Sequence, residues 1–329
     1  MDSGIKTVSS VQETETLRRQ LGNWVLFKAD RQLFAVGVVV AIIAVMATLI
    51  SIDVLAVGPD SSVATIFGSG IVSGVVTLVT IALSINQLVF SRVSGTPGTL
   101  TDRLDGSRNL RREIEELAEQ PSSPNDPATF LSMIAVTLSD RASDLLAKRD
   151  STDWTPPPGV TSALEDLIEY GDNIDDALDE ETTVSTALDT VIGTEYATNM
   201  TAVHHILNAY GSSLPAEVRL DLQALEELLE SIAVVRQFYK TIALQQDFAR
   251  LSRLIVYSGF IALLSAISLA LVYRPDTVMI SPSLLPAMVS VGTGVVLAPL
   301  VVFSVYILRA ATVTRQTVSV GPFIPPDEL

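Results

Sequence analysis

The chain has 329 residues, of which none is cysteine and only two are histidine. This composition excludes a disulfide framework, a thiol nucleophile and a zinc site built on cysteine. With 37 acidic against 21 basic residues, the net charge of −16 opposes binding to nucleic acid or to an anionic membrane surface. Hydrophobic residues make up 48% of the chain and charged residues only 18%, a balance unusual for a soluble domain.

The charged residues also indicate a habitat. Carboxylates are abundant and lysine is scarce, while the short Debye length of concentrated salt would screen the repulsion among the carboxylates. We interpret this pattern as halophilic adaptation, which bears on the environment and not on activity. The only lysines are Lys6, Lys28, Lys148 and Lys240.

Residues 1–31 form a polar segment ahead of the first apolar stretch. Leu17, Leu21 and Trp24 share one helical face just before Arg31, which predicts an amphipathic helix lying in the membrane interface. No small-residue cleavage motif follows the apolar stretch, so we expect it to remain as a span rather than to act as a signal peptide.

Four stretches contain no charged residue at all. A helix that crosses a hydrocarbon core of roughly 30 Å needs about 20 apolar residues, and each stretch is long enough to cross once. We therefore predict transmembrane helices 1 and 2 within 32–91 and helices 3 and 4 within 253–308. The four uncharged stretches are 32–52, 61–91, 254–273 and 277–308.

The basic residues predict the orientation of these spans. Lysine and arginine are frequent next to the spans in residues 1–31, in the middle region and in the tail 309–329. The two short connections between spans contain one basic residue, Arg274. The positive-inside rule then places both termini and the middle region in the cytoplasm of a multi-pass cell-membrane protein.

The middle region, residues 92–252, carries the whole charge excess, with 28 acidic and 12 basic residues. Its apolar pattern is helical, which predicts an acidic helical cytoplasmic domain inserted between spans two and three of an all-α integral membrane protein. We expect its helices to be delimited by an N-cap at Asp126 before Pro127, a break at 154–159, a capping box of Ser162 and Glu165, a helix over 183–210 and one long helix over 215–273.

The second span carries an unusual polar stripe with helical spacing. A helix surrounded by lipid has no need of such a stripe, so it favours either a hydroxyl-lined ion pathway around an oligomer axis or hydrogen bonding between packed helices and to the helix's own carbonyls. Both interpretations stay open. The candidate pore-lining residues are Ser69, Ser73, Thr77, Thr80, Ser84 and Gln87.

Small residues and prolines mark where helices could approach closely. Gly70 and Gly74 form a GxxxG pair beside the polar stripe, and Gly294 belongs to a small-xxx-small pattern in the fourth span. Pro299 removes a backbone donor in the same span, which favours a kink that serves packing or, less so, a gating hinge.

Three further groups have a functional and a simpler interpretation, and we favour the simpler one each time. An arginine cluster after span two could attract anions but also satisfies the positive-inside rule. An acidic helix face could bind a cation but lacks the glycine of an EF-hand loop. Two adjacent histidines point about 100° apart and cannot easily share a metal. The groups are Arg92, Arg103, Arg108, Arg111 and Arg112; Asp172, Asp175, Asp176 and Asp179; and His204 with His205.

The layout resembles that of bestrophin-type anion channels, which keep both termini inside and a helical region between their second and third spans. The resemblance is one of layout and transfers no residue. No span has an internal ionisable residue, so we expect passive conduction rather than an ion-coupled pump.

We therefore expect an oligomeric channel whose second span lines the pathway. The alternative is a membrane-anchored scaffold or sensor whose acidic domain docks a cytoplasmic protein. Expected partners are the lipid bilayer, further copies of the chain and small ions, and nucleic acid is excluded. No motif for nucleotide binding or acyl transfer occurs, so no catalytic residue, cofactor or metal is expected.

Overall fold

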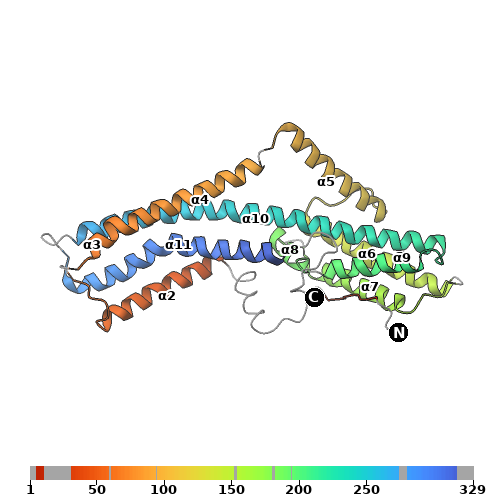
Figure 1. Ribbon diagram of the computed structural model, residues 1–329, viewed down its shortest axis with the longest axis horizontal. Helices are drawn as coiled ribbons and strands as arrows, with labels where there is room; N and C mark the ends of the chain where they lie inside the picture. Colours follow the sequence, from red (N-terminus) through yellow and green to blue (C-terminus); the bar gives the residue numbers. More distant parts are fainter. Residues whose placement is uncertain are drawn as a thin grey trace. The chain divides into compact units, whose positions relative to one another are not determined.

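The computed structural model is helical wherever it describes regular structure (Figure 1), which confirms the all-α expectation. The chain divides into two compact units. We call residues 1–16, 95–243 and 313–329 the polar unit, and residues 17–94 and 244–312 the membrane unit. The described residues are 5–10, 31–58, 61–93, 95–151, 154–179, 182–193, 195–273 and 280–316.

The membrane unit contains helices that are long and apolar enough to cross a membrane. Among the described residues there are four such segments, within Arg31–Ser51, Val63–Leu88, Ala216–Val272 and Pro282–Thr312, which confirms the four predicted spans and makes this a multi-pass membrane protein. The elements are α2 (Arg31–Ser51), α3 (Val63–Thr65), the π-helical segment η2 (Ile66–Ile71), α4 (Val72–Val93), the later part of α10 (Ala216–Val272), the 3₁₀ turn η3 (Pro282–Leu284) and α11 (Leu285–Gln316).

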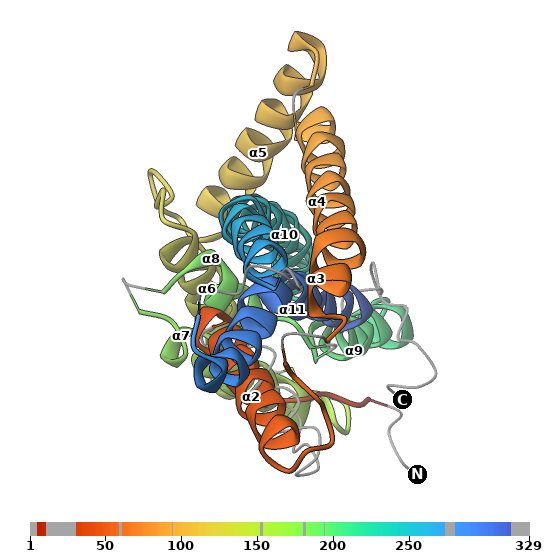
Figure 2. The same ribbon diagram turned by 90° about the vertical axis from the view of Figure 1, so that its left-hand side faces the viewer.

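Within the membrane unit, α10 and α11 lie between α4 and α2 in both ribbon views (Figures 1 and 2). The helices meet through small residues. A Cβ on Gly259 of α10 would lie 2.6 Å from Val79 of α4, and a Cβ on Gly294 of α11 would overlap Ile43 of α2. Because lipid is as apolar as the helices, such close packing holds spans together where the hydrophobic effect does not.

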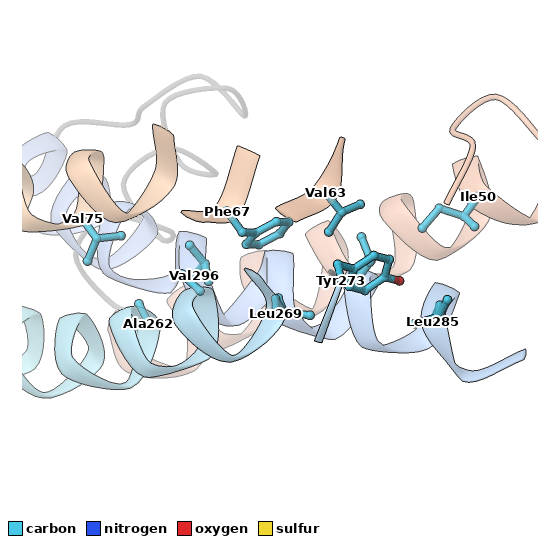
Figure 3. Packing of buried hydrophobic residues seen from close by; sticks show 11 residues of the cluster. Ile50, Val63, Phe67, Val75, Ala262, Leu269, Tyr273, Leu285 and Val296 are labelled. Carbon is cyan, nitrogen blue, oxygen red and sulfur yellow. The ribbon is translucent and has the colours of Figure 1, made fainter. Parts of the chain in front are cut away.

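A buried apolar cluster fills the space between these spans (Figure 3). Phe67 and Val75 approach from the side of α4, and the fully buried Ala262 and Ala266 of α10 leave room for them. The remaining members are Ile50, Val63, Leu269, Tyr273, Leu285, Val289 and Val296.

The polar unit has a core of large aliphatic side chains. Leu131, Ile134, Leu138, Leu164 and Leu167 are all fully buried. The described helices of this unit are α5 (Pro97–Leu117), α6 (Pro127–Ser151), α7 (Val160–Asp176), α8 (Val184–Thr190), α9 (Glu195–Tyr210) and the first part of α10.

The start of α6 and the long α10 agree with the sequence predictions. The Asp126 carboxylate accepts a hydrogen bond of 2.9 Å from the backbone N–H of Thr129, and Pro127 is the first helical residue. A single helix of 57 residues, α10, runs from Ala216 to Val272. No proline interrupts it, and it supplies residues to both units.

The predicted capping box of Ser162 and Glu165 is wrong. The helix α7 begins earlier, at Val160, so Ser162 lies inside its first turn. Its N-cap is Gly159, which has a left-handed φ of 87°. Glycine reaches this conformation without steric cost, so the chain turns into the helix directly after the proline run.

The predicted helix over 183–210 is also wrong, because it is two helices. Thr183 does cap the first, since its hydroxyl accepts a hydrogen bond of 3.3 Å from the N–H of Thr186. The helix α8 then ends at Thr190. The carbonyl of Ile192, between the two helices, accepts a 2.6 Å hydrogen bond from the Arg236 guanidinium. The predicted interfacial helix at Leu17, Leu21 and Trp24 lies outside the described residues.

Candidate functional site

The predicted polar stripe forms a continuous exposed face on the second span. Ser69 belongs to η2 and the other five residues belong to α4. All six side chains are exposed, although they lie on a segment with the hydropathy of a membrane span. We call Ser69, Ser73, Thr77, Thr80, Ser84 and Gln87 the polar face of α4.

The polar face points away from the rest of the membrane unit. Val75 and Ala82 of α4 are buried, and Figure 3 shows Val75 directed toward the interior of the cluster. At 100° per residue, Thr77 lies roughly 140–160° around the helix from these two residues. The chain's own spans therefore pack on the opposite side of α4 and leave the polar face uncovered.

Most of the hydroxyl groups on this face donate to the carbonyl four residues earlier. The Thr77 hydroxyl donates to the Ser73 carbonyl at 2.9 Å, and that of Ser84 donates to the Thr80 carbonyl at 2.9 Å. Each oxygen keeps lone pairs that can accept a further hydrogen bond, so the face is polar but carries no formal charge. The corresponding bonds of Ser69 and Thr80 go to Thr65 at 2.7 Å and to Val76 at 2.9 Å.

Two glycines beside the polar face, Gly70 and Gly74, carry no side chain, so the helix surface there is flat. A Cβ on Gly70 or Gly74 would meet nothing within 4 Å, in contrast to Gly259 and Gly294, where a Cβ would meet a neighbouring helix. The GxxxG pair is therefore not used for packing inside one chain. It offers a flat strip on which the backbone of another helix could lie.

The start of the second span departs from uniform α-helical geometry. Residues 66–71 form a π-helical segment that includes Gly68, Ser69 and Gly70. A π-bulge inserts an extra residue into a turn, so Ser69 is offset from the register that α-helical spacing predicts. A Cβ on Gly68 would lie 3.3 Å from the Cβ of Ala270 in α10, and this close approach accompanies the wider turn.

Sequence reasoning missed a buried ionic cluster at one end of the membrane unit. Arg31 at the start of α2 donates to the Asp247 carboxylate of α10, and Arg309 of α11 lies 3.6 Å from the same carboxylate. The Arg31 guanidinium also lies 5.9 Å from the ring centre of Tyr306. One carboxylate thus joins three spans. The sequence pattern does not reveal this, because Asp247 lies with Arg250 and Arg253 among the charged residues that precede the uncharged stretch 254–273.

The predicted packing residues of the fourth span occupy the interior of the membrane unit. Gly294 lies at the close approach of α11 to α2. Pro299 is buried, and α11 continues through it as a single helix. Since proline lacks an N–H, the carbonyl of Val295 loses its partner in the helix ladder.

The other polar groups that the sequence singled out make structural contacts in the polar unit. Asp172 accepts a hydrogen bond of 2.6 Å from the Ser139 hydroxyl, and Asp175 accepts one from the Ser132 hydroxyl. His204 pairs with Glu226 at 2.7 Å. Within the described part of the chain, no group of three or more histidine, aspartate or glutamate side chains is arranged to hold a metal ion.

The arginine cluster after span two is dispersed. Arg111 donates to the Asn125 side chain at 2.9 Å and lies over the Phe130 ring at the start of α6, while Arg108 lies 3.9 Å from Asp105 on its own helix. These two arginines therefore make local contacts in the polar unit. The Arg92 side chain lies outside the described residues.

Comparison with known families assigns the chain to one of them. Residues 2–329 match the model of the family described as "Family of unknown function (DUF7972)", so the chain belongs to this family. No curated protein matches the chain, and no solved structure matches it either.

Proposed function

We propose that the protein is a homo-oligomeric membrane channel in which the polar face of α4 lines a passive pathway for ions. The observation that carries this proposal is the exposure of all six residues of that face on a membrane-spanning segment. Polar groups cost free energy in hydrocarbon, so a face of this kind is expected to meet water or another polar helix rather than lipid.

Passive conduction fits the charges of the spans. Hydroxyl groups, backbone carbonyls and apolar constrictions are sufficient for an aqueous pore. Pumps and ion-coupled transporters instead use ionisable residues inside the bilayer. The charged cluster of Arg31, Asp247 and Arg309 lies outside the four uncharged stretches, and both guanidinium groups contact the one carboxylate.

The orientation is part of the proposal. By the positive-inside rule, the arginine and lysine residues next to the spans favour an orientation with both termini and the polar unit in the cytoplasm of a cell-membrane protein.

The second candidate is a membrane-anchored scaffold or sensor. It is favoured by the hydrogen bonds of Ser69, Thr77, Thr80 and Ser84 to their own helix, because these donors need no water or partner outside the chain. In this version the shallow face of α4 dimerises the chain, and the acidic polar unit docks a cytoplasmic protein.

Ion flux through purified protein in liposomes at high salt tests the channel. We expect Thr77→Trp to abolish the flux, because the indole would fill a narrow pathway. The matched control is Val45→Trp on α2, an exposed side chain of another span. Flux that survives Thr77→Trp, or that Val45→Trp removes equally, would overturn the assignment of α4 as the pore wall.

The absence of cysteine allows a second, independent test. Thr77→Cys introduces a single thiol on the polar face, and Val45→Cys places one on α2 as the control. In a channel, a water-soluble thiol reagent reaches the first and blocks flux but leaves flux in the second unchanged. A scaffold instead gives a disulfide-linked dimer through Thr77→Cys and no flux in any variant.

A further inference from the structure

Residues 5–10 form an extended segment that is bound to helices of the polar unit. The carboxamide of Asn199 in α9 accepts a hydrogen bond of 2.8 Å from the N–H of Val8 and donates one of 2.9 Å to the carbonyl of the same residue. Asn173 of α7 donates to the carbonyl of Ser9 at 2.8 Å. Thr7 donates from its hydroxyl to the carboxylate of Asp166, also on α7.

Most of these hydrogen bonds are made to the backbone of the segment rather than to its side chains. A carboxamide carries the same donor and acceptor as a peptide group, so Asn199 pairs with Val8 as a neighbouring β-strand would. Asn199 is fully buried, and a buried carboxamide without partners would be costly. The pairing therefore satisfies the hydrogen-bonding groups of the Asn199 side chain as well as those of the Val8 backbone.

Side chains add limited selectivity. The hydroxyl of Thr7 is the only side-chain group of the segment with a described hydrogen bond to the helices, and the Lys6 side chain is exposed. The other residues of the segment are half-buried. Contacts of this kind suit an extended peptide with a hydroxyl residue followed by a residue that offers a free N–H.

We propose that Asp166, Asn173 and Asn199 form a peptide-binding site, and that residues 5–10 occupy it as a displaceable ligand in the same chain. The ligand class is an extended peptide with free backbone N–H and C=O groups at the position of Val8. The segment belongs to the same chain as the site, so it is a tethered ligand. A tethered segment binds at an effective concentration of the order of mM, which makes modest contacts sufficient.

Peptide binding in detergent tests the site without reference to ion flux, so its result is separate from that of the channel proposal. The probe is a fluorescent peptide of residues 3–11, and the receptors are the full chain and a chain that lacks residues 2–10. We expect saturable binding to the shortened chain and at least about ten-fold weaker binding to the full chain, because the resident segment competes.

Two peptide variants leave the receptor untouched. The Val8→Pro peptide lacks the N–H that donates a hydrogen bond to the Asn199 side chain, and its proline ring disturbs the pairing. We therefore expect binding to weaken about ten-fold. The matched control is Lys6→Ala, which removes an exposed side chain and should bind like the unmodified peptide. Equal binding of the Val8→Pro peptide, or no preference for the shortened chain, would overturn the site.

Hydrogen exchange of the full chain covers the case in which the shortened chain does not fold. The amide of Val8 should exchange slowly in the unmodified protein, and Asn173→Ala should accelerate exchange across residues 5–10 while the α6 core stays protected. The unlabelled peptide added in excess should accelerate the same amides by displacement. Fast exchange of Val8 in the unmodified protein contradicts the proposal.

Discussion

The polar unit and the membrane unit are both helical, but different forces hold them together. In the polar unit, large aliphatic residues such as Leu131, Leu138 and Leu164 are fully buried, and acidic side chains cover the outside. In the membrane unit, Leu33, Val45 and other large apolar residues are exposed, and alanine and glycine occupy the contacts between helices.

This difference follows from the two solvents. Water drives large apolar side chains into a core, at about 25 cal/mol per Å² of buried apolar area. Lipid gives no such driving force, so the spans rely on close packing and on a few polar contacts. Charge also differs in use: a buried ionic cluster joins three helices of the membrane unit, whereas an exposed pair such as Asp105 and Arg108 lies on the surface of the polar unit.

The largest expected loss of stability comes from a substitution that breaks the buried ionic cluster of Arg31, Asp247 and Arg309. Asp247→Ala leaves the Arg31 and Arg309 guanidinium groups without their shared carboxylate. Removing one partner from a buried ionic contact costs about 3–5 kcal/mol. Thermal unfolding in detergent should show the loss, and exchange in α2 and α11 should show that it falls on the membrane unit.

The matched control is Asp105→Ala in the polar unit. Asp105 lies 3.9 Å from Arg108, and both side chains are more than half exposed. An exposed pair contributes at most about 1 kcal/mol, so stability should barely change. A similar loss in the two variants would remove the contrast between the buried cluster and the exposed charges.

The next effect concerns packing in the polar unit. A Cβ at Gly171 of α7 would lie 2.6 Å from the Ala135 carbonyl of α6, so Gly171→Val should cost about 1–3 kcal/mol through overpacking. Gly106→Ala on α5 is the control, because a Cβ there meets nothing within 4 Å. That variant should gain up to about 1 kcal/mol from helix propensity, and denaturant unfolding measures both.

The polar face of α4 predicts an effect on assembly without an effect on folding. Gly74→Leu should leave the single chain as stable as before, because a Cβ at Gly74 meets nothing within 4 Å. It should weaken the proposed oligomer, since leucine would hold the facing helix away. The control is Gly37→Leu on α2, which is equally open, and sedimentation in detergent distinguishes the two. Unchanged assembly of Gly74→Leu would exclude the face as an interface.

The smallest effect depends on pH and belongs to the polar unit. Hydrogen bonds from the Thr129 backbone N–H and hydroxyl lower the pKa of Asp126 below its ordinary 3.8. A carboxyl whose pKa is lower in the folded state stabilises the fold above its unfolded pKa, and this contribution is lost as the pH falls through the folded value. The difference in stability between the unmodified protein and Asp126→Ala should therefore shrink below pH 3.8. A difference that stays constant would contradict the cap.

The sequence by itself determined the features that depend on neighbouring residues. Four spans follow from runs of about 20 or more uncharged residues, because the length and hydrophobicity of a run decide by themselves whether it can cross the bilayer. The N-cap at Asp126 depends on residues within one turn, and the unbroken α10 depends on the absence of proline. The polar stripe was visible for the same reason, since helical spacing alone places its six residues on one side.

Only the tertiary structure decided which residues meet across the chain. The carboxylate of Asp247 and the guanidinium of Arg31 are 216 positions apart, and Val8 and Asn199 are 191 apart, so no local pattern predicts either pairing. The burial of Val75 and Ala82, which leaves the polar face of α4 outward, also depends on α10 and α11. Periodicity shows that a helix has two faces, but the free energy of packing against its neighbours selects the face that is covered.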